Sequence, residues 1–430
     1  MLSRFSLYGF LKNQRYFEAF LYLFFIERGL SFTLIGTLVA FREVCINVME
    51  VPSGAVADLY GRRRCMMLSF SAYIGSFVLF GLAHALWMFF AAMLLFAVGE
   101  AFRTGTHKAM IFDWLASEGR AKEKTKFYGY TRSWSQYGSA LSYIVGPVIV
   151  VITAQYASTF WFCIVPYVLG LANFAAYPPL LDGQKPTRVS LKALFGHLLE
   201  ALRQCVGVVS LRRLLAESMT HDGMYKTIKD YVQPLLMATV LAVPVLADVA
   251  EARRVALMVS IVYVPMALLG ALGARRAHQF SEACGGEWAA SRRIWLIELV
   301  VFAGLIPAFL YGVYPVAILA FVALGFFQNV WRPIFLSRVD DSSDAQLGAT
   351  ILSIESQVRS GFVIVAAPLI GLAVDYFGTI WPDGTAKFWP IGAVGVVAVA
   401  VVLLTVNRHG PQVVAALGAS VGGAGDESVG

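Results

Sequence analysis

The sequence predicts an all-α membrane protein with twelve transmembrane helices, arranged as two six-helix halves related by pseudo-two-fold symmetry. Of its 430 residues, 58% are hydrophobic and only 14% are charged, which is too little polar surface for a soluble protein of this size. Apolar runs of roughly 20 residues, the length that crosses a bilayer, recur along most of the chain. Charged residues gather in the short segments between these runs. The lipid bilayer is therefore an expected partner, and nucleic acid is not, although the net charge is +7.

Hydropathy divides the chain into twelve predicted spans. Several are longer than the roughly 20 residues needed to cross, which is expected of tilted or kinked helices. In chain order, the predicted spans are 8–28, 33–58, 65–83, 86–114, 127–152, 158–181, 211–240, 254–273, 292–311, 314–337, 345–374 and 387–407.

The positions of Lys and Arg predict the orientation. With the N-terminus inside, most of the 34 Lys and Arg residues fall in segments on the cytoplasmic side, including Lys12 and Arg15 near the N-terminus and Arg338 after the tenth span. The pair Arg253-Arg254 is the exception. This bias predicts a multi-pass protein of the plasma membrane, the inner membrane of a bacterium, with both termini cytoplasmic. The five cysteines are scattered and form no C-x-x-C pair, so neither a disulfide framework nor a zinc site is expected.

The predicted domains follow from the long central connection. Residues 1–181 form an N-terminal six-helix bundle, 182–210 a cytoplasmic central loop, 211–408 a C-terminal six-helix bundle and 409–430 a disordered cytoplasmic tail. The central loop carries an apolar stripe at helical spacing, which predicts an amphipathic helix on the inner membrane face, with a loose linker as the alternative. Its members are Leu191, Leu194, Phe195, Leu198 and Leu202.

A polar turn joins the second and third spans. It reads Gly54-Ala-Val-Ala-Asp58-Leu-Tyr-Gly61-Arg62-Arg63-Arg64. Gly54 would let a neighbouring helix approach closely, and Asp58 can pair with Arg62 or face the positive end of another helix. Gly61 permits the turn. The simpler interpretation is a positively charged anchor alone.

This turn resembles the G-x-x-x-D-x-x-G-[RK]-[RK] signature of the major facilitator superfamily, and the preceding Glu50-Val-Pro-Ser53 is similar to a variant in bacterial members. The resemblance implies a twelve-helix secondary transporter that works by alternating access. It also implies that Asp58, Arg62 and Arg63 help to lock the inner gate in the outward-facing state. The copy in the second half, Gly270–Arg276, lacks the aspartate. A glycine-proline pattern from Gly138 to Gly146-Pro147 is partly similar to that of drug-proton antiporters and predicts kinking and close packing.

Charged and polar side chains within the spans are candidates for the central cavity, because a charge near the bilayer centre costs several kcal/mol. The resemblance implies that spans one, four, seven and ten line that cavity, and these spans carry them: Glu18 in span one; Glu100, Arg103 and His107 on one face of span four, with Lys108 beside them; His221, Asp222 and Lys226 in span seven; Gln328, Asn329 and Arg332 in span ten. Glu355 and Arg359 are spaced to pair on one helix and to hold helices together.

The resulting hypothesis is a monomeric secondary transporter of a polar or charged small solute, coupled to protons. Cations such as Arg103 and Arg332 can meet an anion, while Glu18, Glu100 or Asp222 can carry the proton. The alternatives are a divalent-metal transporter of the iron type, a drug or metabolite exporter, and a non-transporting sensory or scaffold protein.

The sequence assigns no metal site beyond two candidate ligands, and enzyme chemistry is not expected. His107 and His221 are candidate metal ligands, but the sequence alone does not fix their mutual geometry. Asp340-Asp341-Ser-Ser-Asp344 matches the DDxxD pattern of prenyl transfer, and the second acidic motif that such enzymes require is missing. No Walker sequence occurs. The chain is therefore not expected to be an enzyme or to hold a cofactor.

Overall fold

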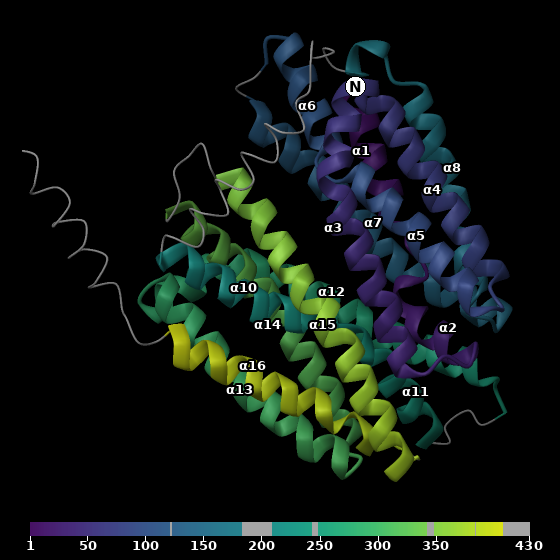
Figure 1. The fold of residues 1–430 in the computed structure, drawn as a ribbon, viewed down its shortest axis with the longest axis vertical. Coiled ribbons are helices and arrows are strands. Elements are labelled where there is room, and N and C mark those ends of the chain that lie inside the picture. Colours follow the sequence, from purple (N-terminus) through teal and green to yellow (C-terminus); the bar gives the residue numbers. More distant parts are fainter. Residues whose placement is uncertain (121–122, 183–208, 243–247, 342–347, 383, 407–430) are drawn as a thin grey trace, which may run out of the picture.

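The computed structural model describes residues 1–120, 123–182, 209–242, 248–341, 348–382 and 384–406, and these residues are almost entirely helical (Figure 1). Ten of the described helical segments are long and apolar enough to cross a membrane. The predicted all-α membrane class is confirmed. The predicted number of twelve spans is not confirmed by this measure, because the first and seventh predicted spans are each broken into shorter helices. The predicted amphipathic segment and the predicted C-terminal tail lie outside the described residues.

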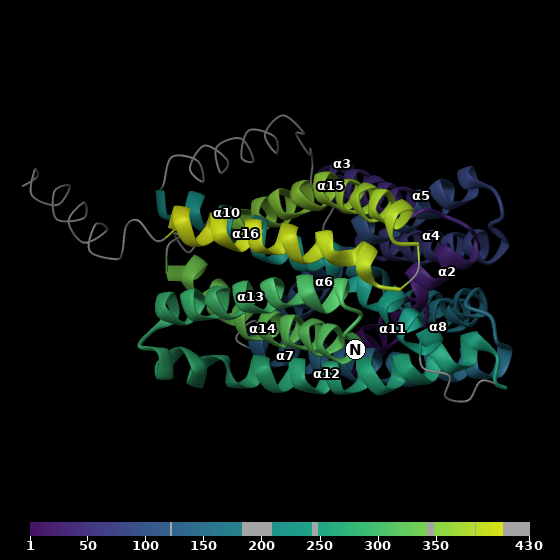
Figure 2. The same cartoon turned by 90° about the horizontal axis from the view of Figure 1, so that it is seen from below.

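The helices gather in two bundles, one formed by the N-terminal part of the chain and one by the C-terminal part (Figures 1 and 2). The first contains α1 (Leu2–Leu11), α2 (Leu21–Glu27), α3 (Phe32–Tyr60), α4 (Arg62–Leu82), α5 (Leu86–Arg103), α6 (Thr106–Ser117), α7 (Lys124–Thr153) and α8 (Ser158–Ala175). The second contains α10 (Val209–Ile228), α11 (Val232–Ala242), α12 (Glu251–Cys284), α13 (Glu287–Leu310), α14 (Tyr314–Asp341), α15 (Gly348–Ile380) and α16 (Trp389–Val406).

An unwound segment, 12–17, interrupts the first predicted span. It leads from α1 into a 3-10 turn (η1, Glu18–Phe20) and then α2. Backbone and side-chain polar groups within hydrocarbon must find partners inside the protein. Asn13 donates to the carbonyl of Ser135 at 2.6 Å, and Gln14 donates to that of Gly138 at 3.1 Å. The interrupted span is thus held against α7.

The seventh predicted span is interrupted in the same way, by a 3-10 turn (η4, Lys229–Tyr231) between α10 and α11. The side chain of Gln233, just after this turn, reaches the first span. Its Oε1 accepts from the amide of Tyr22 at 2.8 Å, and its Nε2 donates to the carbonyl of Glu18 at 2.9 Å. The two interruptions therefore meet where the bundles meet.

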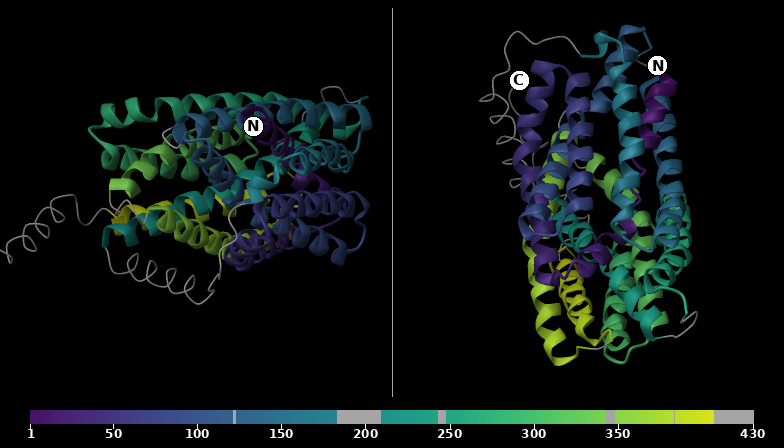
Figure 3. Two further views of the ribbon diagram at one scale, coloured as in Figure 1. Left: turned by 90° about the horizontal axis from the view of Figure 1, so that it is seen from above. Right: turned by 90° about the vertical axis from the view of Figure 1, so that its right-hand side faces the viewer.

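The bundles approach each other at the ends that carry α2 and α11 and lie at an angle to one another (Figures 1 and 3). Helix α3 packs along α15, and α7 packs along α12. Two glycines let α3 and α15 touch backbone to backbone. A Cβ on Gly36 would lie 2.2 Å from the carbonyl oxygen of Ala367, and one on Gly371 would lie 2.2 Å from that of Phe32. This end of the interface is closely packed.

Large apolar side chains cover the outside of both bundles, as expected where lipid rather than water surrounds the protein. Examples that are more than half exposed are Ile152, Val165, Leu169, Ile261, Leu268, Val300, Leu319 and Val397. The charged side chains described next lie on the inner faces of the helices.

Candidate functional site

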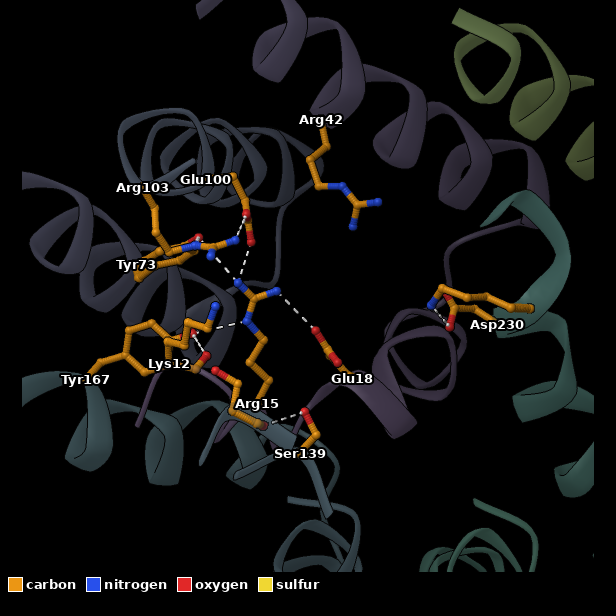
Figure 4. Close-up of polar contacts among 12 residues, drawn as sticks. Lys12, Arg15, Glu18, Arg42, Tyr73, Glu100, Arg103, Ser139, Tyr167 and Asp230 are labelled. Atoms are coloured by element: carbon orange, nitrogen blue, oxygen red, sulfur yellow. Dashed lines mark hydrogen bonds and ion pairs between the residues drawn. The ribbon is translucent and has the colours of Figure 1, made fainter. Parts of the chain in front are cut away.

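Arg15 is the centre of a polar cluster in the N-terminal bundle (Figure 4). Because it lies on the unwound segment, its guanidinium reaches three helices. It donates to Glu18 at 3.1 Å, to the hydroxyl of Tyr167 at 3.1 Å and to that of Tyr73 at 3.3 Å, and it forms an ion pair with Glu100. We call this set, with Arg103, the Arg15 cluster.

Glu100 is bound by two arginines. Arg103 pairs with its second carboxylate oxygen and also donates to Tyr73 at 3.1 Å. The Glu100 side chain is 15% exposed, whereas that of Glu18 is 44% exposed. Glu18 is therefore the more accessible carboxylate of the cluster. The charge of Glu100 is balanced by the two arginines that bind it.

The role of Arg15 differs from the sequence-based expectation. From the sequence it is expected among the cytoplasmic cations, although it falls within the predicted span 8–28. The interruption instead turns its side chain inward, where it is 15% exposed. The signal that identifies it is its spacing three residues before Glu18 within an apolar run.

His107 does not share a helical face with Glu100 and Arg103, contrary to expectation. The fourth predicted span is divided at Thr104–Gly105, where Gly105 has φ of 79°, a conformation that favours glycine. Helix α6 then starts anew, and the His107 ring lies 3.8 Å from the ring of Tyr8, centre to centre. Its Nε2 is buried and has no hydrogen-bond partner in the described part of the protein.

His107 lines a pocket of about 230 Å³ between α1, α6 and α7, next to the Arg15 cluster. Its walls combine cations, amides and hydroxyls with aromatic rings. The lining residues are Phe5, Tyr8, Gly9, Lys12, Asn13, His107, Tyr128, Thr131, Arg132, Ser135 and Gln136. We call it the α1–α7 pocket.

A second network lies in the C-terminal bundle. Asp222 on α10 accepts from Gln328 at 2.6 Å, from Arg359 at 2.7 Å and from Arg332 at 3.4 Å. Arg332 also binds both oxygens of Glu355, at 2.9 and 3.0 Å. This network joins α10, α14 and α15.

The predicted pair of Glu355 and Arg359 is present but long, at 3.7 Å, and each residue has a closer partner in the Asp222 network. Asn329 lies apart from Gln328. It donates to the carbonyl of Gly325 within its own helix and packs against Gly270 of α12, so in this conformation it serves helix packing.

The other polar residues of α10 do not form one cluster, although they are close in sequence. Glu217 and His221 share one face and both contact Trp331, whereas Lys226 faces α3. His221 pairs with Glu298 of α13 at 2.9 Å, and Lys226 pairs with Glu43 of α3 at 2.7 Å. Glu217 pairs with Arg338 at 2.7 Å and accepts from Trp331, also at 2.7 Å.

Arg338, expected in a loop after the tenth span, instead lies in the last turn of α14, and its side chain is 2% exposed. Glu298, a lone acid within an apolar span, is not among the candidates predicted from the sequence. Its isolation is the signal that should have identified it.

Glu43 links the two bundles. Besides Lys226, its carboxylate accepts from Ser360 of α15 at 2.8 Å and from the neighbouring Arg42 at 3.0 Å. The Glu43 side chain is only 2% exposed. This contact lies between α3, α10 and α15.

The arginines of the Gly54–Arg64 turn contact residues of their own bundle. Gly61 has φ of 101°, as expected of the turn. Arg62 pairs with Asp113, and Arg63 lies 3.8 Å from Asp182 and donates to the carbonyl of Tyr177 at 2.9 Å.

Gly54 does not bring a second helix close, contrary to expectation. It is exposed, and a Cβ there would have no described atom within 4 Å. The side chain of Asp58 lies outside the described residues.

The described residues contain no group of three or more His, Cys, Asp and Glu side chains placed to hold a metal ion. His107 and His221 lie in different bundles. The geometry of that part of the chain thus brings together no ligand set around either histidine.

Three comparisons relate the chain to known proteins. A family model described as Major Facilitator Superfamily matches residues 15–360. No curated protein matches the sequence. The structure is similar to that of the nucleoside transporter NupG, at 13% sequence identity, with a TM-score of 0.76 and coverage of 95% of this chain and 99% of that one.

Two further solved structures are similar. One is a D-xylose-proton symporter, at 14% identity, with a TM-score of 0.66 over 93% of this chain and 95% of that chain. The other is a bacterial homolog to human lysosomal transporter Spinster in an inward-facing and occupied conformation, at 14% identity, with a TM-score of 0.69 over 95% and 96%. At these identities the likeness concerns the fold alone.

Proposed function

Because the chain belongs to the Major Facilitator Superfamily, we propose that it is a secondary active transporter that moves a polar or charged small solute by alternating access. In this proposal twelve spans form two six-helix halves, with the interrupted first and seventh spans as two of the twelve. The observation that carries it is the pair of ion networks around Arg15 and Asp222, one in each bundle, on interrupted spans. Interrupted helices at corresponding positions of two halves are typical of transport sites.

The arrangement of the bundles supports a site that is open to the cytoplasm in this conformation. They are held together at the end of α2 and α11, where Gln233 bridges both interrupted spans. The excess of Lys and Arg on the other side supports cytoplasmic termini in a plasma membrane of the bacterial inner type. In that orientation the closed end is outer, and the solute exchanges with the cytoplasm in this conformation.

Proton coupling is part of the proposal. The two carboxylates that Arg15 binds suggest a mechanism for this coupling. Arg15 binds Glu18 and Glu100 at the same time. Protonation of Glu18 would remove one of its charged partners and free the guanidinium for a solute. One structural neighbour is a D-xylose-proton symporter, which supports this coupling, and another is a nucleoside transporter, which supports a polar solute.

The test is uptake into proteoliposomes made with the purified full chain, with and without an imposed pH gradient. The solutes to screen are nucleosides, pentoses, amino acids and small organic acids. Gradient-driven accumulation of one solute is expected, and Arg15→Gln should lower it at least tenfold because it removes the charged centre of the cluster.

Arg120→Gln is the matched control, since Arg120 forms an exposed pair with Glu123 outside the spans. It should transport like the wild type. The transport function would be contradicted if no solute accumulated above protein-free liposomes, and the site if Arg15→Gln matched the control. Unchanged gradient dependence in Glu18→Gln, Glu100→Gln and Asp222→Asn would contradict the proton coupling.

A further inference from the structure

The α1–α7 pocket differs from the two ion networks in its charge balance. Each described arginine of those networks pairs with a carboxylate. In the pocket, Lys12 and Arg132 have no carboxylate within ion-pair distance in the described part of the chain, and the lining includes no acidic residue. The described walls therefore hold an excess of positive charge that no carboxylate in them neutralises. Among the described wall groups, the ring of Tyr8, 5.4 Å from the Lys12 ammonium, is the one that contacts this cation.

A buried ring nitrogen in the same wall lacks a partner among the described residues. His107 is 8% exposed, and its Nε2 makes no hydrogen bond to described residues. A buried polar group of this kind costs free energy unless a ligand or water satisfies it. Amide and hydroxyl donors from Asn13, Ser135 and Gln136 surround the same space.

We propose that the α1–α7 pocket binds the acidic group of a small anion, either a carboxylate or an inorganic oxyanion, with Lys12 and Arg132 as its charged contacts and His107 as a donor. This rests on the proposed transport function, and it names the substrate class. A volume of about 230 Å³ is below the roughly 300–1,000 Å³ of pockets for drug-sized ligands, which favours a small solute.

Anion binding is tested with the full-length protein in detergent by thermal unfolding and tryptophan fluorescence. The probes are malonate, inorganic phosphate and the neutral malonamide at equal ionic strength. Malonate or phosphate should stabilise the protein at millimolar concentration, and malonamide should not. A response to malonate alone assigns a carboxylate, and a response to phosphate alone assigns an inorganic oxyanion.

Lys12→Gln and Arg132→Gln should each weaken binding by about tenfold, the loss expected of one charge-assisted contact. Arg132 is exposed, so its variant should fold even if the Lys12 variant does not. Lys124→Gln, a nearby cation that does not line the pocket, is the control. Equal responses to malonate and malonamide, no response to either anion, or unchanged binding in Arg132→Gln would overturn the proposal. Binding requires no gradient, so retained anion binding with no uptake would count against the transport function only.

A second inference rests on α3 and α15. The last turns of α15 read Gly371-Leu-Ala-Val-Asp375-Tyr-Phe-Gly378, which repeats the G-x-x-x-D-x-x-G spacing of Gly54–Gly61 at the end of α3. Asp375 caps the start of α3 in the other bundle. Its carboxylate accepts from the amide of Phe32 at 2.9 Å and from the amide and hydroxyl of Thr33 at 2.7 and 2.6 Å.

Helices α3 and α15 run in opposite directions, so the end of α15 lies beside the start of α3 (Figure 1). We infer that Asp375 is a latch that closes the α2–α11 end of the interface, in the position opposite to the Gly54–Gly61 turn. An anion at a helix N-terminus satisfies free amides and complements the helix dipole. Gly371 permits the approach, because any side chain there would meet the backbone of Phe32.

Solvent access to the closed end tests the latch. Leu38→Cys, a buried position on α3, is introduced into a chain without native cysteines and labelled with a membrane-impermeant maleimide. Asp375→Asn should increase labelling severalfold, and Thr33→Val, which removes one hydrogen bond, should do so to a smaller degree. Glu251→Gln, which changes an acid at the start of α12, is the control. Labelling by Asp375→Asn and Thr33→Val at the level of the control would overturn the inference.

Discussion

Several buried charges among the described residues are paired with charges on other helices. The pair of Glu217 and Arg338 is the clearest case, because both side chains are at most 2% exposed and two hydrogen bonds of 2.7 and 2.8 Å join them. Trp331 donates to Glu217, and the hydroxyl of Ser291 accepts from Arg338. A pair of this kind stabilises little by itself, but breaking it leaves an uncompensated charge.

Removing one charge of this pair should destabilise the protein strongly. Glu217→Gln leaves Arg338 buried without its anion and should lower the free energy of unfolding by roughly 3–5 kcal/mol. Thermal unfolding in detergent measures it. Glu123→Gln, which breaks the exposed pair with Arg120, should cost less than about 1 kcal/mol. Equal effects of the two changes would contradict the structural role of Glu217.

At the scale of the helix, glycines decide how the interrupted first span is held. A Cβ on Gly138 would lie 2.4 Å from the carbonyl oxygen of Phe10, and one on Gly146 would lie 2.7 Å from that of Tyr16. These contacts place α7 directly against the unwound segment that carries Arg15. The predicted close packing of the Gly138–Pro147 pattern thus has a specific partner.

Two glycine-to-alanine changes on α7 should have opposite effects. Gly138→Ala forces α7 away from α1 and should cost about 1–3 kcal/mol, as overpacking does. Gly129→Ala adds a Cβ that would have no described atom within 4 Å, and the better helix propensity of alanine should leave stability unchanged or raise it by up to about 1 kcal/mol. Unfolding midpoints of both variants provide the comparison, and a tolerated Gly138→Ala would disprove the tight approach.

At the scale of the molecule, few polar contacts join the bundles within the described residues, and each one can influence their relative position. Glu43 with Lys226 and Ser360 lies deep in the interface. Gln233 and Asp375 lie at the end where the bundles converge. Alternating access requires such contacts to break and reform, because the halves move as bodies.

A double-mutant cycle should show that Glu43 and Lys226 couple the bundles. The variants are Glu43→Gln, Lys226→Met and the combination of both. Their unfolding free energies should be non-additive by about 0.5–3 kcal/mol, the range for residues in direct contact. Glu43→Gln combined with Lys387→Gln is the control, because Lys387 contacts the ring of Phe388 instead. This control pair should be additive to within about 0.5 kcal/mol, and an equally additive test pair would refute the coupling.

The fold class and the family could be predicted from the sequence because they depend on properties that act locally along the chain. The length of an apolar run decides whether it crosses a bilayer, and short motifs such as Gly54–Gly61 identify the superfamily. Candidate site residues such as Arg103, Asp222 and Arg332 were found for the same reason, since a charge within an apolar run stands out.

The tertiary structure alone decided where helices break and which charges meet. Hydropathy does not register the unwound segment at 12–17 or the break at Gly105. The polar side chains of the unwound segment find partners on α7. The sequence predicts that Arg15 and Arg338 lie on the cytoplasmic side. In the structure Arg15 pairs with Glu100 and Arg338 pairs with Glu217. Partner choice depends on the face of each helix and on its neighbours, which is a property of the packed bundle and is not encoded in any one stretch of the chain.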